Sequence, residues 1–191
     1  MKRRALTAAT IIALVGLLAP ACGAPAPEGI EPRYTNDAWG LSMWYPDDWT
    51  HQESEFGGVV FASSEQLFTG QESESGASMF VVAVPVGRAP GTEGVCDQLV
   101  MHFGAAFLED PEASDPQPRT IGGQDGCAIT FESKLWGEKG FAAVTVCEGW
   151  LYLFQGGSSL DEWSQHGPEL EAMLDSVQFT APARPTPAST G

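Results

Sequence analysis

The sequence predicts an α+β domain in which a single antiparallel β-sheet is packed between helices. Three patterns support this fold class. Apolar residues alternate at Leu41, Met43 and Tyr45, which is typical of a strand with two different faces. Residues 78–86 are almost continuously apolar, as in a central strand covered on both faces. Apolar residues recur every three or four positions through 93–108, as in a helix with one buried stripe.

The N-terminal segment 1–21 is predicted to be a signal peptide and is kept out of the fold. A basic stretch at 2–4 precedes an apolar stretch at 5–19. Residues 18–22, LAPAC, resemble the lipobox of bacterial lipoproteins, in which the cysteine receives a diacylglyceryl group. Cys22 is therefore the predicted lipid attachment site. The mature protein is expected to be anchored in the cell membrane at its extracytoplasmic face.

Two other interpretations of the N-terminus stay open. Ala19-Pro20-Ala21 also fits the cleavage site of ordinary secretion, which would leave the Cys22 thiol unmodified. The second open interpretation is an uncleaved membrane helix, although a helix needs about 20 apolar residues to span a bilayer. The apolar stretch here is shorter and ends at Pro20.

The rest of the chain divides into a tether, one domain and a tail. Residues 22–32 are rich in Pro, Ala and Gly and are predicted to form a flexible tether. Residues 181–191 have a similar composition and are predicted to be disordered. The segment between them, 33–180, has the usual length of one domain.

The chain is strongly acidic, with a formal net charge of −16. Cleavage before Cys22 would remove three of the 9 basic residues and none of the 25 acidic ones. Such a surface repels nucleic acid and anionic lipid headgroups, so we exclude both as direct partners. The preferred interpretation of the acidity is solubility, with a basic partner or cations as the alternative.

The predicted strands follow one another along the chain, which favours antiparallel pairing of roughly five to seven strands. The domain opens with a strand in 34–49 that ends in a turn at Pro46-Asp47-Asp48. The further strands are expected at 59–62, 78–86, 119–121, 125–133, 140–148 and 150–155, and 176–179 is expected to be a short strand or an extended end.

Two helical regions are predicted. The first is 93–108. The second begins at a capping box, in which Ser159 caps the third helical N–H and Glu162 reaches back. Gly167-Pro168 is expected to interrupt this helix and to start a second segment at 169–175.

Three cysteines remain in the domain if Cys22 is lipidated, and an exported chain is expected to form one disulfide. A hairpin folded about Gly137 would set Cys127 opposite Cys147, within disulfide reach. Cys127–Cys147 is therefore the predicted bridge. Cys96 would then be a buried thiol on a helix, with the alternative that it displaces one of the other two.

The two ends of the domain resemble the PsbP-like family, whose members include extrinsic photosystem subunits and many bacterial lipoproteins. The opening matches the family pattern Tyr…Asn…aromatic-Gly-apolar-Ser-apolar-x-aromatic-Pro-x-x-Trp, and the ending matches Met-Leu-x-Ser-Val-x-Phe. The matching positions are Tyr34, Asn36, Trp39, Gly40, Leu41, Ser42, Met43, Tyr45, Pro46, Trp49, Met173, Leu174, Ser176, Val177 and Phe179. The resemblance implies an antiparallel sheet between helices in a protein that acts as a binding or assembly module. It implies no functional residue.

No catalytic, metal or cofactor site is predicted. The sequence has no G-x-S-x-G elbow, phosphate-binding loop or dinucleotide fingerprint. His51, His102 and His166 are far apart and do not have metal-ligand spacing. The acidic residues at 109–115 are Ca²⁺-type ligands without EF-hand spacing, so a solvated loop is the preferred interpretation.

If a ligand site exists, two tryptophans are its most promising residues. Trp44 and Trp136 occupy strand or turn positions from which an indole can face water, so we predict them as ligand-facing. The main functional hypothesis is an exported, lipid-anchored, non-catalytic module that binds an unknown protein partner. The alternatives are a small-ligand or lipophile carrier with an aromatic-lined cleft between sheet and helix, and a hydrolase without recognisable motifs.

Overall fold

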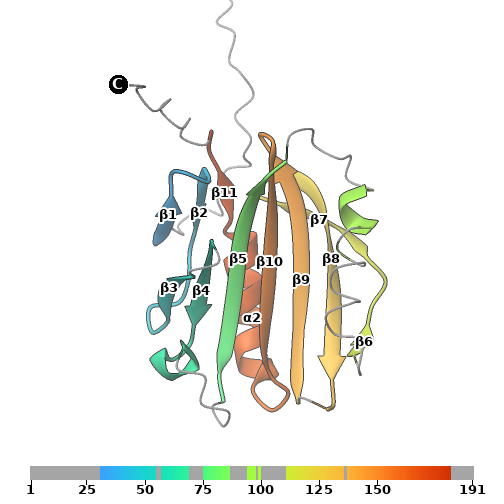
Figure 1. Ribbon diagram of the computed structural model, residues 1–191. Helices are drawn as coiled ribbons and strands as arrows, with labels where there is room; N and C mark the ends of the chain where they lie inside the picture. The colour runs from blue at the N-terminus through green and yellow to red at the C-terminus, as the bar shows by residue number, and fades with distance from the viewer. Residues whose placement is uncertain are drawn as a thin grey trace, which may run out of the picture.

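The computed structural model describes residues 31–54, 57–68, 75–86, 94–97, 99, 111–135 and 137–181 (Figure 1). Its elements are β1 (Tyr34–Asn36), β2 (Leu41–Met43), β3 (Thr50–Ser54), β4 (Gly58–Ala62), the 3-10 helix η1 (Glu65–Phe68), β5 (Ala77–Pro85), β6 (Pro111–Ala113), β7 (Gln117–Ile121), β8 (Gln124–Ser133), β9 (Glu138–Cys147), β10 (Trp150–Ser159), α2 (Trp163–Asp175) and β11 (Gln178–Phe179). The predictions for the signal peptide 1–21, Cys22 and Trp136 lie outside the described residues. So do most of the tether 22–32, the helix 93–108 and the tail 181–191.

An eight-stranded sheet forms the centre of the molecule, in the order β3-β4-β5-β10-β9-β8-β6, with β7 paired to β8 beside this path. All of its neighbouring strands are antiparallel, as predicted. Two meanders, β3–β4–β5 and β8–β9–β10, follow the chain. The long-range pairing of β5 with β10 joins them, with Val81 opposite Phe154.

A second sheet of three strands, in the order β1-β2-β11, shows that the predicted single sheet is wrong. Strand β2 ends at Met43 because the next backbone N–H, of Trp44, donates to the Ser176 hydroxyl at 2.9 Å instead of to a strand. The alternation at Leu41 and Met43 therefore marks a short strand in the middle of a small sheet. Ser42 between them is buried as well.

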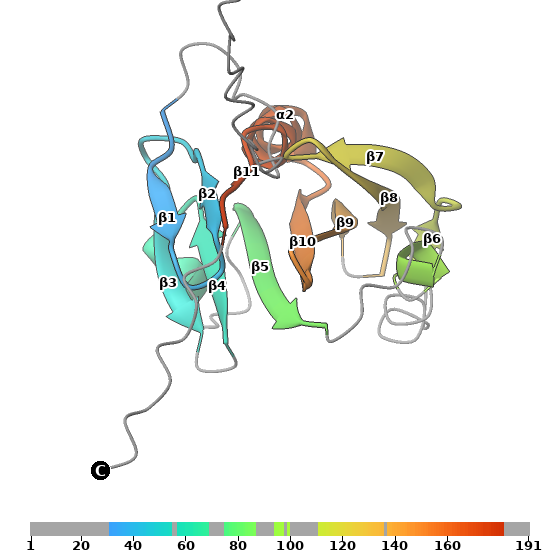
Figure 2. The ribbon, with the colours of Figure 1, turned by 90° about the horizontal axis from the view of Figure 1, so that it is seen from above.

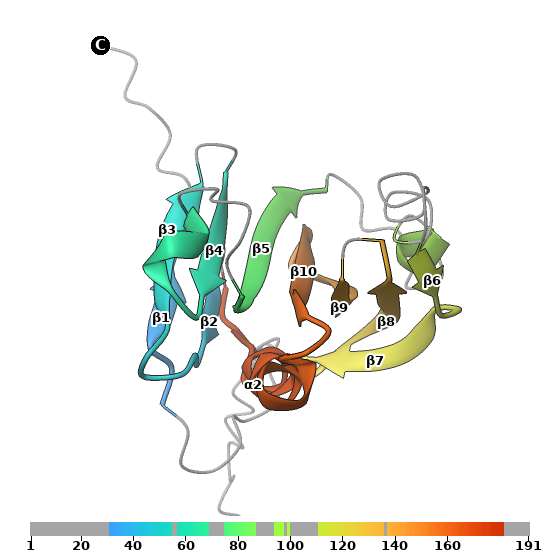
Figure 3. The same ribbon diagram turned by 90° about the horizontal axis from the view of Figure 1, so that it is seen from below.

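The two faces of the eight-stranded sheet carry different elements (Figures 1 and 2). We call the face that packs against α2 the back face. There α2 lies between the small sheet on one side and β7 on the other, as Figure 3 also shows from below. The main core lies in this layer, where Phe61, Val81, Phe154 and Leu170 have no exposed surface. In the described part of the chain one long helix covers this face, so a sheet sandwiched by helices is not observed.

Helix α2 runs without interruption from Trp163 to Asp175, and the predicted break at Gly167-Pro168 is wrong. Pro168 removes one backbone hydrogen bond in the second turn. The buried contacts of Leu170, Met173 and Leu174 hold the helix together because tertiary packing supplies most helix stability.

The predicted capping box is also not formed. Ser159 ends strand β10, and the residue before the helix is Glu162, which makes no side-chain capping hydrogen bond. The two side chains instead contact each other, with Ser159 Oγ donating to Glu162 Oε2 at 3.1 Å.

We call the opposite face of the sheet the open face. Residues 94–97 and 99 are helical, which agrees with the described part of the predicted helix, and they pack on β8 and β9. Val95 and Leu99 form a second core cluster there with Ile129, Ala142 and Val144. Among the described residues, the part of this face made by β4, β5 and the end of β10 carries no covering helix.

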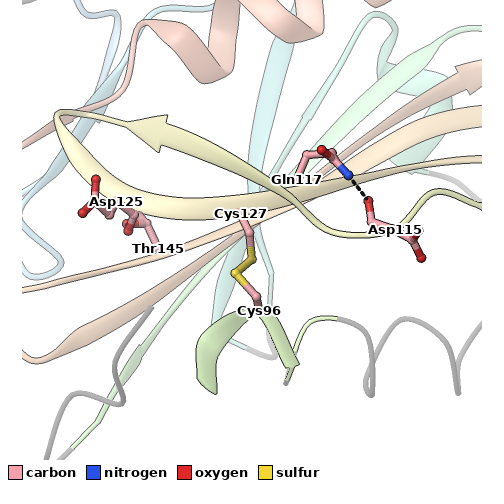
Figure 4. Close-up of a disulfide and its surroundings, with 6 residues drawn as sticks. All are labelled: Cys96, Asp115, Gln117, Asp125, Cys127 and Thr145. Carbon is pink, nitrogen blue, oxygen red and sulfur yellow. Dashed lines mark hydrogen bonds between the residues drawn. A yellow bond between two sulfur atoms is a disulfide. The ribbon is translucent and has the colours of Figure 1, made fainter. Parts of the chain in front are cut away.

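A disulfide between Cys96 and Cys127 attaches this helical segment to β8, with Cα atoms 5.8 Å apart (Figure 4). The predicted Cys127–Cys147 bridge is wrong for two reasons. The hairpin turns over 134–137, so Cys127 pairs with Val144 instead of Cys147. Cys147 also points to the back face and is buried in its core, whereas Cys127 belongs to the open face.

Candidate functional site

A cleft of about 910 Å³ lies at one end of the open face. It occupies the region where β5 begins and β10 ends, next to the β8–β9 hairpin, the turn before α2 and the loop before β5. Its volume is within the range of roughly 300–1,000 Å³ that is usual for ligand sites. It is about three times as large as the hollow beside Arg119 described below, and we treat it as the candidate site.

The floor of the cleft is a row of small residues on three neighbouring strands. Gly157 of β10 pairs with Ser78 of β5 on one side and with Gly140 of β9 on the other. Successive side chains of a strand point to opposite faces, so these three positions share the open face. The cleft is deep here because the backbone of β10 forms its base.

The two glycines of this row differ in whether packing requires a residue without a side chain. Neither has a positive φ, so backbone conformation does not require glycine at either position. A Cβ at Gly140 would lie 2.3 Å from the carbonyl oxygen of Gly156, which is a severe clash with backbone. A Cβ at Gly157 would have its nearest neighbours at 3.4 and 3.9 Å, which is ordinary contact. Gly157 is therefore not required by packing, and its effect is to keep the floor of the cleft clear.

Two phenylalanines form apolar walls. Phe80 of β5 leans over β4, where its ring fills the space that a side chain at Gly58 would occupy. Phe131 of β8 leans over Gly140, with its Cζ 2.6 Å from the position of a Cβ there. Glycines on the adjacent strands thus let both rings lie against the sheet. The result is a polar floor between two aromatic surfaces.

The remaining rim carries carboxylates. Glu138 at the start of β9, and Asp161 and Glu162 in the turn before α2, all line the cleft. Partial burial of the Glu138 carboxyl raises its pKa above the usual value, because burial disfavours the charged form. No lysine or arginine among the described residues lines the cleft.

The structure places the predicted ligand-facing residues elsewhere or does not describe them. Trp44 is half-buried and packs against the back-face core, so it does not line the cleft. Trp136 lies outside the described residues, although its neighbours Gly137 and Glu138 line the cleft. Phe80, Phe131 and Gly157 were not predicted as site residues from the sequence. The available signal was the pair Gly156-Gly157 inside a strand, since an interior strand glycine often marks a close approach of a ligand or of another backbone.

A smaller hollow of about 310 Å³ lies beside Arg119 on β7. Arg119 donates to Glu171 at 2.6 Å and to Asp175 at 2.7 Å, both on α2. Its partial burial lowers the pKa of the guanidinium, and the hydrogen bonds and charges of the two carboxylates outweigh this, so the pKa is raised. We interpret this pair of salt bridges as the attachment of β7 to α2.

The remaining polar groups make contacts within the fold. Within the described residues no group of three or more His, Cys, Asp or Glu side chains is placed to hold a metal ion. His166 is buried, with its Nδ1 2.8 Å from Glu169 Oε2 and its ring against Trp49. His51 belongs to an aromatic cluster with Tyr34, Tyr45 and Phe61. Among the helices that the structure describes, none combines the length and the apolar character needed to span a bilayer.

The fold resembles that of cyanobacterial PsbP (CyanoP) from Synechocystis sp. PCC 6803, with a TM-score of 0.54 at 18% identity over 82% of this chain and 98% of that chain. It also resembles LpqN of Mycobacterium tuberculosis, described as involved in cell envelope biogenesis, with a TM-score of 0.51 at 14% identity over 73% of this chain and 83% of that chain. No family model and no curated protein sequence matches the chain. The expected PsbP-like fold is therefore confirmed as a mixed α+β fold with antiparallel sheets. At these identities the similarity shows the fold alone.

Proposed function

We propose that this protein is an exported, lipid-anchored and non-catalytic binding module that holds a protein partner in the cleft of its open face. The observation that carries the proposal is Gly157, a residue that neither backbone conformation nor packing requires and that leaves the floor of the cleft clear. A cleft on the face of a sheet suits a side chain presented by a larger partner, because the surrounding surface then supplies further contact area.

The non-catalytic part of the proposal is supported by the surroundings of the polar groups. His166 is engaged with Glu169, and Arg119 is engaged with two carboxylates of α2. Among the residues that the structure describes, the cleft is lined by phenylalanine, aliphatic, glycine, serine, glutamine and carboxylate residues and by no histidine or cysteine. Such a lining suits binding better than acid–base or nucleophilic chemistry.

The proposed location rests on the N-terminal sequence. The lipobox-like residues 18–22 favour acylation of Cys22, and the tether would hold the domain at the extracytoplasmic face of the membrane. Intact mass of the membrane-extracted protein tests this directly. A mass that begins at Cys22 and includes acyl groups is the expected result. A chain without acyl groups would indicate simple secretion instead.

Site-specific cross-linking tests the binding face. A photoreactive benzoylphenylalanine in place of Ser75 lies at the exposed rim of the cleft, and the same residue in place of Gln165 lies on the exposed surface of α2 as a matched control. We expect one discrete adduct in native membranes from position 75 and not from position 165. Filling the cleft with Gly157→Leu should abolish that adduct. Equal labelling from both positions, or labelling that survives G157L, would contradict the proposal.

The cleft also supports a second candidate, a carrier of a small or lipophilic ligand. Its volume of about 910 Å³ and its two phenylalanine walls are suitable for such a molecule. Native mass spectrometry of the purified protein distinguishes the two. A small molecule that co-purifies with wild type and is lost in G157L would favour the carrier.

A further inference from the structure

The carboxylates of the cleft are placed together at one end of it. Glu138 lies at the start of β9, whereas Asp161 and Glu162 lie in the turn that follows β10. Glu162 has a structural task as well, because it accepts a hydrogen bond from Ser159 and precedes the first turn of α2. The other two have no such contact among the described residues, so the cleft presents negative charge that the fold does not visibly use.

The basic side chains that the structure describes with ion pairs are engaged away from the cleft. Arg33 pairs with Asp47 at 2.7 Å and lies over the ring of Tyr45. Arg119 pairs with the carboxylates of α2. Lys139 pairs with Glu132 at 3.4 Å on the back face. The fourth basic residue of the described part of the chain, Lys134, has an interaction partner and does not line the cleft. The carboxylates that line the cleft thus have no lysine or arginine beside them in its lining.

The aromatic walls favour an apolar group beside the cation. Phe80 and Phe131 both line the cleft, and an apolar side chain placed between them would lose contact with water. The raised pKa of Glu138 agrees with this placement, because the cleft removes part of the carboxyl from water although the residue as a whole is exposed. A cation brought to this carboxyl would interact more strongly than one in bulk water.

We infer that the partner segment held in this cleft presents an arginine or lysine side chain next to an apolar one, with the cation at Glu138 and Asp161 and the apolar group between Phe80 and Phe131. This inference rests on the proposed binding function and names the chemistry of the partner. A basic peptide segment is favoured over a free organic cation because it can fill the carboxylate end and the phenylalanine walls of the cleft at the same time and adds flanking contacts on the sheet face.

The test is amide chemical-shift mapping with defined peptides. The probe is acetyl-Ala-Phe-Arg-Phe-Ala-amide, and its control carries citrulline, an uncharged isostere, in place of arginine. We expect the arginine peptide to shift the amides of Ser78, Gly140 and Gly157. The citrulline peptide should bind about five- to tenfold more weakly, as expected for the loss of two partly screened charge pairs. The same loss is expected when salt is raised.

Two protein variants test the carboxylates. Glu138→Gln with Asp161→Asn should weaken the arginine peptide about five- to tenfold and leave the citrulline peptide unchanged. Glu31→Gln with Asp48→Asn removes the same charge from exposed positions outside the cleft and should change binding by less than about twofold. Equal weakening by both double variants would overturn the site and leave only general attraction to an acidic protein.

The outcomes separate the inference from the proposed function. Equal binding of the arginine and citrulline peptides, or no binding of either, overturns the inference while the cross-link at position 75 still decides the function. If benzylammonium binds as tightly as the peptide, the ligand of the cleft is a small organic cation and not a protein segment. Failure of the cross-link as well would remove the proposed function itself.

Discussion

The two faces of the eight-stranded sheet are built from the same strands and are covered in different ways. On the back face, α2 and the small sheet form a continuous core in which Phe61, Val81 and Phe154 have no exposed surface. On the open face, the helical segment at 94–99 covers β8 and β9 and is attached by a disulfide. The neighbouring part of the open face keeps a cleft. The difference suggests that the back face supplies stability, whereas the open face supplies a surface that remains available for binding.

The largest expected effect comes from removing the covalent attachment on the open face. The Cys96–Cys127 disulfide joins positions 31 residues apart, and a loop of that length predicts a loss of roughly 3–4 kcal/mol in the variant Cys96→Ser with Cys127→Ser. Urea unfolding measures the loss, and wild type with and without reductant is the control. Reduction that leaves the wild-type midpoint unchanged would show that the attachment adds no stability.

A second prediction compares two paired glycines of the cleft floor. Gly140→Ala should cost about 3 kcal/mol because its Cβ meets backbone, whereas Gly157→Ala should stay within about 0.5 kcal/mol of wild type. Thermal or urea unfolding of both variants provides the measurement. If the two variants lost equal stability, Gly157 would be a packing requirement and the argument for a cleared floor would fail.

A third prediction compares the packing of the back face and the open face by truncating one valine on each. Val81 has no exposed surface on the back face, and Val82 is half-buried on the open face of the same strand. We expect Val81→Ala to cost about 2–3 kcal/mol and Val82→Ala about 1 kcal/mol, from the apolar groups removed and the cavity left. The loss of strand propensity is shared by both variants. Equal costs in urea unfolding would mean that the open face is packed as tightly as the back face.

The smallest expected effect appears only at alkaline pH. Tyr34 is buried between the small sheet and β4, and its hydroxyl donates to Glu53 at 3.1 Å. Burial, more than the nearby Glu53 carboxylate, raises its pKa from 10.0 to about 12, while a hydrogen bond from Asn36 opposes the shift. The folded state thus binds this proton more tightly, so stability is complete below the ordinary pKa and is lost as pH rises from about 10 to about 12.

Tyrosinate absorbance provides the measurement for Tyr34. The difference between the titrations of wild type and Tyr34→Phe isolates this phenol from those of the other tyrosines. A midpoint near 12 agrees with a buried hydroxyl, and a midpoint near 10 would show that it is open to solvent. At neutral pH the same difference should vanish.

Local patterns predicted most of the strands, the described residues of the helix at 93–108 and the region of α2, because side-chain periodicity is set by neighbours in sequence. The apolar run at 78–86 corresponds to β5, and the hairpin at 125–148 corresponds to β8 and β9. The division into two sheets was missed because it depends on Trp44 meeting Ser176, a contact between opposite ends of the domain. The uninterrupted α2 was missed because packing outweighed the local preference of Gly167-Pro168.

Neither the disulfide nor the cleft could be predicted from local sequence patterns, and the reasons are related. A shift of the hairpin centre by less than two residues changed the partner of Cys127 and placed Cys147 on the other face. Such a register depends on turn conformation, which periodicity does not specify. The cleft combines Phe80, Phe131 and Gly157, which are brought together only by the pairing order of the sheet. The glycine pair inside β10 was the one available sign.

The small sheet has a consequence for biosynthesis. Strand β2 pairs with β11, so Leu41 meets Phe179, and the Trp44 N–H bonds Ser176 across 132 residues. A ribosome releases the N-terminal part of a domain first. Strand β2 therefore has one unpaired edge until β11, the last strand of the domain, has been synthesised. Such distant pairing slows folding, and a nascent chain would remain open to chaperones or proteases for most of its synthesis. A premature stop before residue 178 would leave that edge permanently exposed.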